Sequence, residues 1–126
     1  MLLNLSDHSD ETLQEQLVRQ VRAQVLAGDL PAGTDLPSIR GLAREQRVSV
    51  ITVQRAYEWL ERAGLIQARR GKGFFVLPLT EAERESMALA NLDAGLVPLL
   101  EQARAEGLSA GAIQRRVTVI LEGVPA

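Results

Sequence analysis

The sequence predicts a mainly helical chain that carries one small β-hairpin. Apolar residues recur at steps of three and four in successive stretches of the chain, as they do along one face of an α-helix. Two short β-type runs, at residues 65–68 and 74–77, flank a glycine-bearing turn, as the strands of a hairpin do. With 126 residues, of which 46% are hydrophobic, the chain can bury a core.

The first predicted helix follows a short polar segment. Residues 1–11 show no periodic apolar face, and we expect them to form a loose arm. A helix is predicted from Thr12 onward, and Gly28 should end it because glycine adopts the left-handed conformation at no steric cost. Its apolar stripe, at steps of four, consists of Leu13, Leu17, Val21 and Val25.

Two shorter helices joined by a tight turn come next. Ser38 and Ser49 are candidate caps for them, because a serine hydroxyl accepts hydrogen bonds from the free amides of a helix start. The turn falls at residues 46–48, and Gly64 should end the second helix. This pattern is typical of a helix-turn-helix. The apolar positions are Ile39, Leu42 and Ala43 in the first helix, and Val53, Ala56, Tyr57, Leu60 and Ala63 in the second.

A basic hairpin follows these helices. Its turn carries three positive charges, and Pro78 should close the second strand because proline has no amide to donate. A helix-turn-helix followed by such a hairpin is a winged helix-turn-helix, which we place at residues 12–78. The residues of the turn are Arg69, Arg70, Gly71, Lys72 and Gly73.

The remainder, residues 79–126, is predicted to be a helical appendage. Its first helix should kink or break at Pro98, where the missing amide opens the hydrogen-bond ladder, and Ser109 should cap a last short helix. The apolar faces of these helices exceed what one winged helix can cover, so we expect a helical dimerisation region that pairs two copies of the chain. The residues of this predicted interface are Leu89, Leu92, Leu96, Leu99, Leu100, Ala103, Ile113, Val117, Ile120 and Leu121.

The charge distribution indicates a nucleic-acid partner although the net charge of the chain is −2. Residues 39–73 contain eight Arg or Lys against three Glu, a net of +5, whereas residues 1–38 carry −4 and residues 74–126 carry −3. A basic segment inside an acidic chain is expected of a local DNA-binding face. The alternative, a solvated charged helix face, would be favoured if the basic residues were evenly spread.

The second helix of the pair offers side chains for reading base edges. Gln54 can pair with adenine, and Arg55 can reach guanine or a phosphate. Val50 and Ile51 are apolar at an exposed helix start, and for Val50 we favour contact with a base or sugar over packing against the preceding helix. Thr52 also faces outward or toward the groove.

Other residues are placed to meet phosphates. Arg40 and Arg44 lie on the first helix of the pair, and Ser38 can add its hydroxyl or neighbouring amides. The alternative for Arg40 is a solvated side chain or a partner for Glu45. In the hairpin, the glycines let the backbone approach a sugar-phosphate surface closely, and the alternative there is a solubilising turn.

No enzyme chemistry is predicted. The chain has no cysteine, and its one histidine, His8, is expected at the surface. The sequence shows no nucleophile elbow, phosphate-binding loop or metal-ligand cluster, so we expect no catalytic site, no metal and no cofactor. Tyr57 and Trp59 fall at helical spacing, which favours packing in the core or in an interface over a stacking platform for single strands.

The sequence predicts neither a membrane span nor a large effector domain. No apolar run approaches the roughly 18 residues of a membrane helix, and residues 1–10 show no signal pattern, so we expect a cytoplasmic protein. The length leaves no room for a second large domain. A small-molecule effector would need a pocket within or between the tail helices, and no convergent polar set marks one.

About half of the chain resembles the DNA-binding domain of GntR-type bacterial transcriptional regulators. The pieces LPSIRGLA, TVQRAYEWLERAGLI and GKGFFV occur in the order and spacing of that family. The short tail resembles the YtrA-type branch. The resemblance implies a homodimer that binds a pseudo-palindromic operator, usually as a repressor and, in this branch, often one that controls transporter genes. It places DNA contacts on Ser38, Arg40, Ser49, Val50, Thr52, Gln54 and residues 71–73.

The chain departs from the family pattern at the start of the recognition helix. Val50 and Ile51 are apolar where many members have a basic or polar residue, and Gln54 replaces an expected charged donor. Arg47 stands where a glycine is common in the turn. These departures concern the operator sequence and not the fold. The alternative function is a winged helix that serves as a protein–protein interaction module without sequence-specific DNA binding.

Overall fold

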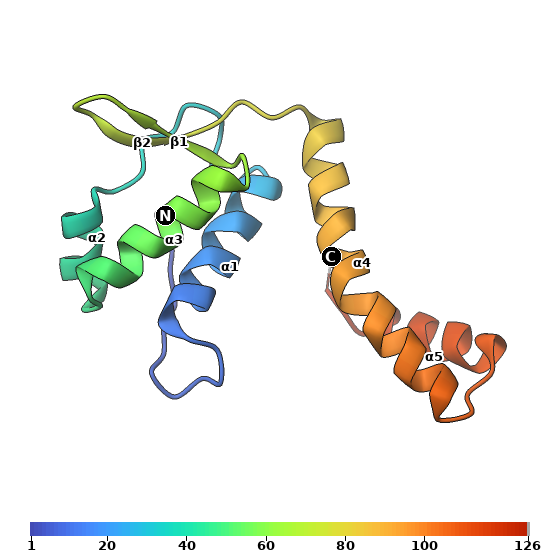
Figure 1. Ribbon diagram of the computed structural model, residues 1–126. Coiled ribbons are helices and arrows are strands. Elements are labelled where there is room, and N and C mark those ends of the chain that lie inside the picture. The colour runs from blue at the N-terminus through green and yellow to red at the C-terminus, as the bar shows by residue number, and fades with distance from the viewer. Residues whose placement is uncertain (126) are drawn as a thin grey trace. The chain divides into compact units, whose positions relative to one another are not determined.

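The computed structural model describes residues 1–125, which form two compact units, Met1–Glu85 and a second that begins at Ser86. The mainly helical class with one β-hairpin is confirmed. The elements are, in chain order, α1 (Leu13–Leu26), α2 (Ile39–Gln46), α3 (Val50–Arg62), β1 (Ile66–Arg69), β2 (Gly73–Val76), α4 (Glu81–Ala105) and α5 (Ala110–Glu122) (Figure 1).

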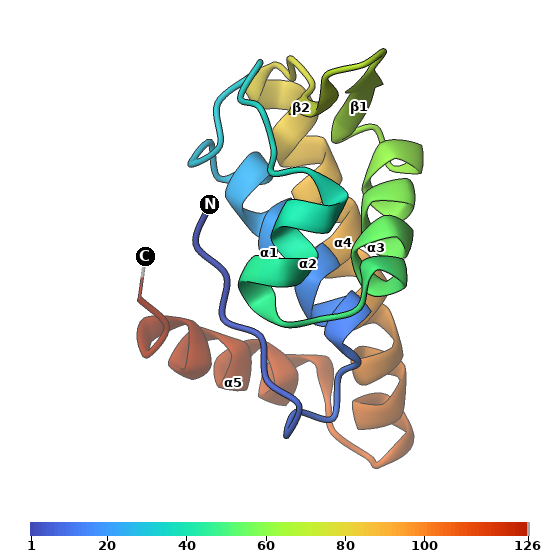
Figure 2. The ribbon, with the colours of Figure 1, turned by 90° about the vertical axis from the view of Figure 1, so that its left-hand side faces the viewer.

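The core of the first unit forms around α3. Both α1 and α2 pack against α3, and the three helices lie side by side in Figure 2. The inward side chains of α3 are fully buried, as are Leu17 and Val21 of α1. Burial of each large apolar side chain contributes about 1.5–3 kcal/mol to folding. The core residues that α3 supplies are Val53, Ala56, Tyr57 and Leu60, which confirms the predicted inward face except for Ala63, the half-buried C-cap residue.

Tyr57 joins three parts of this core. Its hydroxyl donates a hydrogen bond of 2.7 Å to the carbonyl of Pro37, just before α2. Its ring meets that of Phe74 in β2 edge to face, with the ring centroids 5.0 Å apart. Burial raises the pKa of the Tyr57 phenol above its ordinary value. The phenol therefore stays protonated, and it holds the start of α2 and the wing in place against α3.

Serine caps and one left-handed residue set the boundaries of the helix-turn-helix. The Ser38 hydroxyl accepts a hydrogen bond of 3.0 Å from the Gly41 amide, and the Ser49 hydroxyl accepts one of 3.1 Å from the Thr52 amide. Both predicted caps are confirmed. Arg47 ends α2 with φ at 56°, the left-handed region that glycine would occupy more easily. The turn therefore keeps its geometry without the glycine.

The wing is an antiparallel hairpin of β1 and β2, in which Ile66 lies opposite Val76. The loop before α2 runs along the other edge of β2. There the Leu36 amide donates to the Phe74 carbonyl and the Val76 amide donates to the Thr34 carbonyl, each at 2.9 Å. This loop covers the strand edge that would otherwise be free to pair with another chain.

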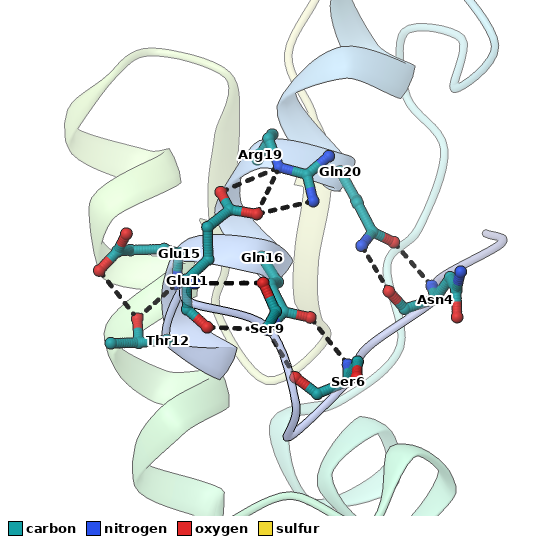
Figure 3. A network of polar contacts seen from close by, with 9 residues as sticks. All are labelled: Asn4, Ser6, Ser9, Glu11, Thr12, Glu15, Gln16, Arg19 and Gln20. Atoms are coloured by element: carbon teal, nitrogen blue, oxygen red, sulfur yellow. Dashed lines mark hydrogen bonds and ion pairs between the residues drawn. The ribbon is translucent and has the colours of Figure 1, made fainter.

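The N-terminal segment is not a loose arm, so that expectation is wrong. Glutamines one turn apart on α1 bind the main chain of residues 1–11 (Figure 3). Gln20 exchanges two hydrogen bonds of 2.7 Å with the main chain of Asn4, and Gln16 exchanges two of 2.8 Å with that of Ser6. The apolar periodicity of the sequence could not predict this arrangement, because hydrogen bonds from side-chain amides, and not apolar contacts, hold the segment against α1.

Helix α4 starts with a reciprocal cap and continues through its proline. The Glu83 amide donates to the Thr80 hydroxyl at 3.0 Å, and the Thr80 amide donates to the Glu83 carboxylate at 3.1 Å. These bonds hold the pKa of Glu83 below its ordinary value. The sequence predicted a kink or a break at Pro98, and the break is absent because the helix is continuous there. An internal proline removes one helix hydrogen bond, and the turns on either side keep theirs.

The second unit consists of α5 and the part of α4 beyond Glu85. Ser109 caps α5 as predicted. No residue of α4 or α5 is buried in the single chain. A groove of about 520 Å³ between these helices is lined mainly by apolar residues, among them Leu96, Leu100 and Ile113. None of the described helices combines the length and hydropathy needed to cross a lipid bilayer.

Candidate nucleic-acid interface

The start of α3 presents apolar side chains to solvent. Val50 is 46% exposed and Ile51 is 50% exposed. The alternative in which both pack against the preceding helix is therefore wrong. Val53 and Ala56 are buried on the inward face of α3, which fixes the direction in which the first turn points. Two exposed β-branched residues at one helix start form a surface suited to an apolar partner such as a thymine methyl group.

The polar residues on this face of α3 use only part of their hydrogen-bonding capacity within the chain. The Gln54 amide donates a hydrogen bond of 3.3 Å to the Glu58 carboxylate, one turn along α3. Its carbonyl oxygen and second amide hydrogen remain free to contact a base. Arg55 is exposed and makes no ion pair within the described chain. The Ser49 and Thr52 hydroxyls lie 2.8 Å apart, so both belong to the cap at the helix start.

Helix α2 carries two exposed arginines, Arg40 in its first turn and Arg44 in its last. Arg40 and Arg44 make no ion pair with a described residue, so the suggested pairing of Arg40 with Glu45 is absent. Ser38 is exposed and holds the helix start. A Cβ at Gly41 would lie 2.7 Å from the Ser38 hydroxyl oxygen, so the glycine makes room for the cap. This geometry leaves both guanidinium groups free to meet phosphates.

The structure distinguishes the three cations of the wing. The Arg69 guanidinium lies 3.9 Å from the centre of the Phe75 ring and 3.7 Å from an Asp35 carboxylate oxygen. Arg70 and Lys72 are exposed and have no such partner among the described residues. Gly71 and Gly73 have φ of 74° and 78°, which is the left-handed region that glycine tolerates, so the turn is tight. The wing therefore presents Arg70 and Lys72 more freely than Arg69.

The parts of the predicted site lie on one side of the first unit. The wing turn, α2 and the start of α3 all face left in Figure 1, and that side faces the viewer in Figure 2. Tyr57 is in the core as predicted, whereas Trp59 is 39% exposed, so core packing of Trp59 is wrong for the single chain. The described residues contain no group of three His, Cys, Asp or Glu that could hold a metal ion.

The sequence model described as bacterial regulatory proteins, gntR family, matches residues 13–76. This match spans half of the chain. The chain belongs to the GntR family. This GntR-family chain is therefore a transcriptional regulator with a DNA-binding helix-turn-helix, and not an enzyme, as the sequence predicted.

Individual relatives agree with this assignment. The chain is 34% identical over 116 residues to the HTH-type transcriptional regulator Rv1152 of Mycobacterium tuberculosis, a match that covers 92% of this chain and 91% of that protein. It is 33% identical over 75 residues to the HTH-type transcriptional repressor YtrA of Bacillus subtilis, which covers 60% of this chain and 58% of YtrA. The similarity to YtrA supports the predicted branch of the GntR family.

A solved structure agrees over nearly the whole chain. The GntR-family chain superposes on a protein from Listeria monocytogenes EGD-e, described as a transcriptional antiterminator, with a TM-score of 0.74 and 27% identity. The superposition covers 95% of this chain and 90% of the other. The likeness therefore includes the C-terminal helices as well as the winged helix.

Proposed function

We propose that the chain is a homodimeric repressor that binds a pseudo-palindromic operator in double-stranded DNA. The observation that carries this proposal is the exposed first turn of α3, with Val50 and Ile51 about half exposed beside Gln54 and Arg55. Exposed apolar side chains gain from contact with thymine methyl groups, and the neighbouring amide and guanidinium can read other base edges. The resemblance to the YtrA-type branch suggests transporter genes as targets.

Phosphate contacts would come from the free cations around this helix. Arg40, Arg44, Arg70 and Lys72 are exposed and lack ion partners among the described residues. Contacts to phosphates set the position of a protein on the duplex, whereas contacts to base edges set its sequence preference. We assign these four residues to positioning and the start of α3 to specificity, within a DNA-binding domain at residues 12–78.

Dimerisation would be the task of residues 79–126. No residue of the predicted apolar stripe is fully buried in the single chain, and Leu99 and Leu121 are each 67% exposed. Monomeric proteins rarely expose contiguous apolar patches of more than a few hundred Å². A second copy of the chain supplies a matching apolar surface, and a symmetric pair places two recognition helices about 34–36 Å apart on successive major grooves.

The test is DNA binding by the full chain, measured by fluorescence anisotropy on genomic fragments selected by the protein and on random duplexes of equal length. We expect tight binding to selected fragments that weakens steeply with salt, because phosphate neutralisation releases counterions. Arg40→Ala should weaken binding to both kinds of DNA, whereas Gln54→Ala should relax preference at one or two base positions. Equal affinity for selected and random duplexes would favour the protein-interaction module.

A further inference from the structure

A small pocket in the first unit lies outside the proposed DNA-binding face. It encloses about 250 Å³ between the turn after α1, the end of β2 and the first turn of α4. Val25, Leu30, Val76 and Leu77 contribute apolar walls. Arg84 is the only charged residue that lines it. This cavity, with apolar side chains and one cation at its wall, is not the pocket between the tail helices that a small-molecule effector was expected to need.

The charge of Arg84 has no counter-charge in the described chain. The side chain is half-buried, its Nε atom is shielded from solvent, and the guanidinium donates no hydrogen bond to a described residue. No carboxylate lines the pocket. A half-buried cation without a counter-charge costs free energy, and a bound anion would recover part of that cost. Among the described residues no carboxylate is placed to supply that counter-charge.

Gly28 makes room for this guanidinium. A Cβ at position 28 would lie only 2.5 Å from the Arg84 Nη1 atom, and Gly28 has φ of 84°. Gly28 also follows the end of α1, where the partial negative charge of the helix C-terminus attracts a cation. That partial charge helps to hold the guanidinium at the pocket wall, but it does not supply the full counter-charge of a carboxylate.

We propose that this pocket binds a small organic monoanion, namely a carboxylate with a short apolar body. The carboxylate would pair with the outer nitrogens of Arg84, which suit planar two-oxygen ligands, and the apolar body would lie against Val25 and Leu30. The volume is below the roughly 300–1,000 Å³ of pockets for drug-sized ligands, which limits the ligand to few atoms. A bound anion would tie the first turn of α4 to the turn after α1.

The test is a titration of the ¹⁵N-labelled full chain with sodium benzoate and sodium pentanoate, followed through the backbone amide signals of Gly28, Ala32 and Leu77. We expect saturable shifts in the millimolar range, and at least tenfold weaker shifts with the neutral benzamide and pentanamide. Inorganic phosphate has charge but no apolar body, so it should also bind at least tenfold more weakly. No DNA enters this measurement, so its result is independent of the proposed repressor function.

Two pairs of variants locate the site. Arg84→Gln should weaken carboxylate binding at least tenfold, whereas Arg116→Gln, in α5 outside the pocket, should leave it unchanged. Gly28→Ala should weaken it, whereas Gly33→Ala should not, because Gly33 has a similar φ of 83° but no atom within 4 Å of an added Cβ. The proposal is overturned if neither carboxylate gives saturable shifts, if the amides bind as well, or if Arg84→Gln binds like the unaltered chain.

Discussion

At the residue scale, three wing cations of equal charge stand in different surroundings. Arg69 lies over the Phe75 ring and beside Asp35, whereas Arg70 and Lys72 project without an ion partner in the described chain. The Arg69 ion pair is exposed and 3.7 Å long, so it contributes little to stability. Its contact with the ring contributes about 0.5–1 kcal/mol. The side chain of Arg69 is therefore suited to stabilising the wing through contacts within the chain.

Substitutions in the wing should distinguish the stabilising role of Arg69 from the phosphate contact proposed for Arg70. Arg70→Ala should weaken binding to all duplexes and reduce the salt dependence by about one released counterion, because it removes one phosphate contact. Arg69→Ala should change the salt dependence less and lower the thermal stability of the chain instead. Anisotropy at several salt concentrations, together with thermal melting, measures both effects. An equal loss of salt dependence in the two variants would contradict this division.

At the element scale, the N-terminal segment is held along α1 by hydrogen bonds from two glutamines of that helix. Gln16 is 2% exposed. Its side-chain amide donates to the carbonyls of Ser6 and Glu11 at 2.8 and 2.9 Å, while its carbonyl accepts from the Ser6 amide at 2.8 Å. Gln20 makes the same kind of exchange with Asn4 at an exposed position. Because water can replace exposed hydrogen bonds, the two glutamines should differ in their contribution to stability.

Gln16→Ala should lower the free energy of unfolding by about 1–3 kcal/mol, because it leaves partly buried main-chain groups of residues 6 and 11 without partners. Gln20→Ala is the matched control on the next turn of α1, and its cost should stay near 0.5–1.5 kcal/mol, since water reaches the released groups. Urea unfolding of both variants provides the measurement. If the Gln20 variant lost as much stability as the Gln16 variant, the difference in burial would not decide the cost.

At the scale of the whole molecule, the positive charge is concentrated in the winged helix, and the rest of the chain is acidic. The net charge of +5 on residues 39–73 coincides with α2, α3 and the wing, which the structure brings to one side of the first unit. The second unit has no buried residue in its helices and an apolar groove between them. These properties suit the proposed roles of DNA recognition for the first unit and dimerisation for the second.

Two neighbouring positions on α5 test the pairing surface. Ile120 and Val119 are 53% and 56% exposed, but successive residues of a helix point roughly 100° apart. Ile120→Glu should shift the chain toward monomers in analytical ultracentrifugation and weaken binding to selected duplexes, because a charge buried in an apolar interface is costly. Val119→Glu lies off the predicted stripe and should remain dimeric. Dimers in both variants would place the interface elsewhere.

The amino-acid pattern by itself determined the class of fold, the helix starts and the family. Ser38, Ser49 and Ser109 cap helices where local pattern placed them, because capping depends on a few neighbouring residues. The exposure of the first turn of α3 was also predicted from the sequence, because the apolar periodicity identifies the inward face of the helix. The role of the C-terminal helices and the DNA contacts themselves stay predictions that the experiments above address.

Only the tertiary structure decided which groups meet across long separations in sequence. The pairing of the N-terminal segment with α1, the attachment of Arg69 to Asp35 and the approach of Arg84 to Gly28 join residues that lie 10 or more positions apart. No periodic pattern encodes such contacts, because they depend on where the folded elements place the side chains. The structure also shows that α4 continues through Pro98, although proline removes one hydrogen bond of the helix.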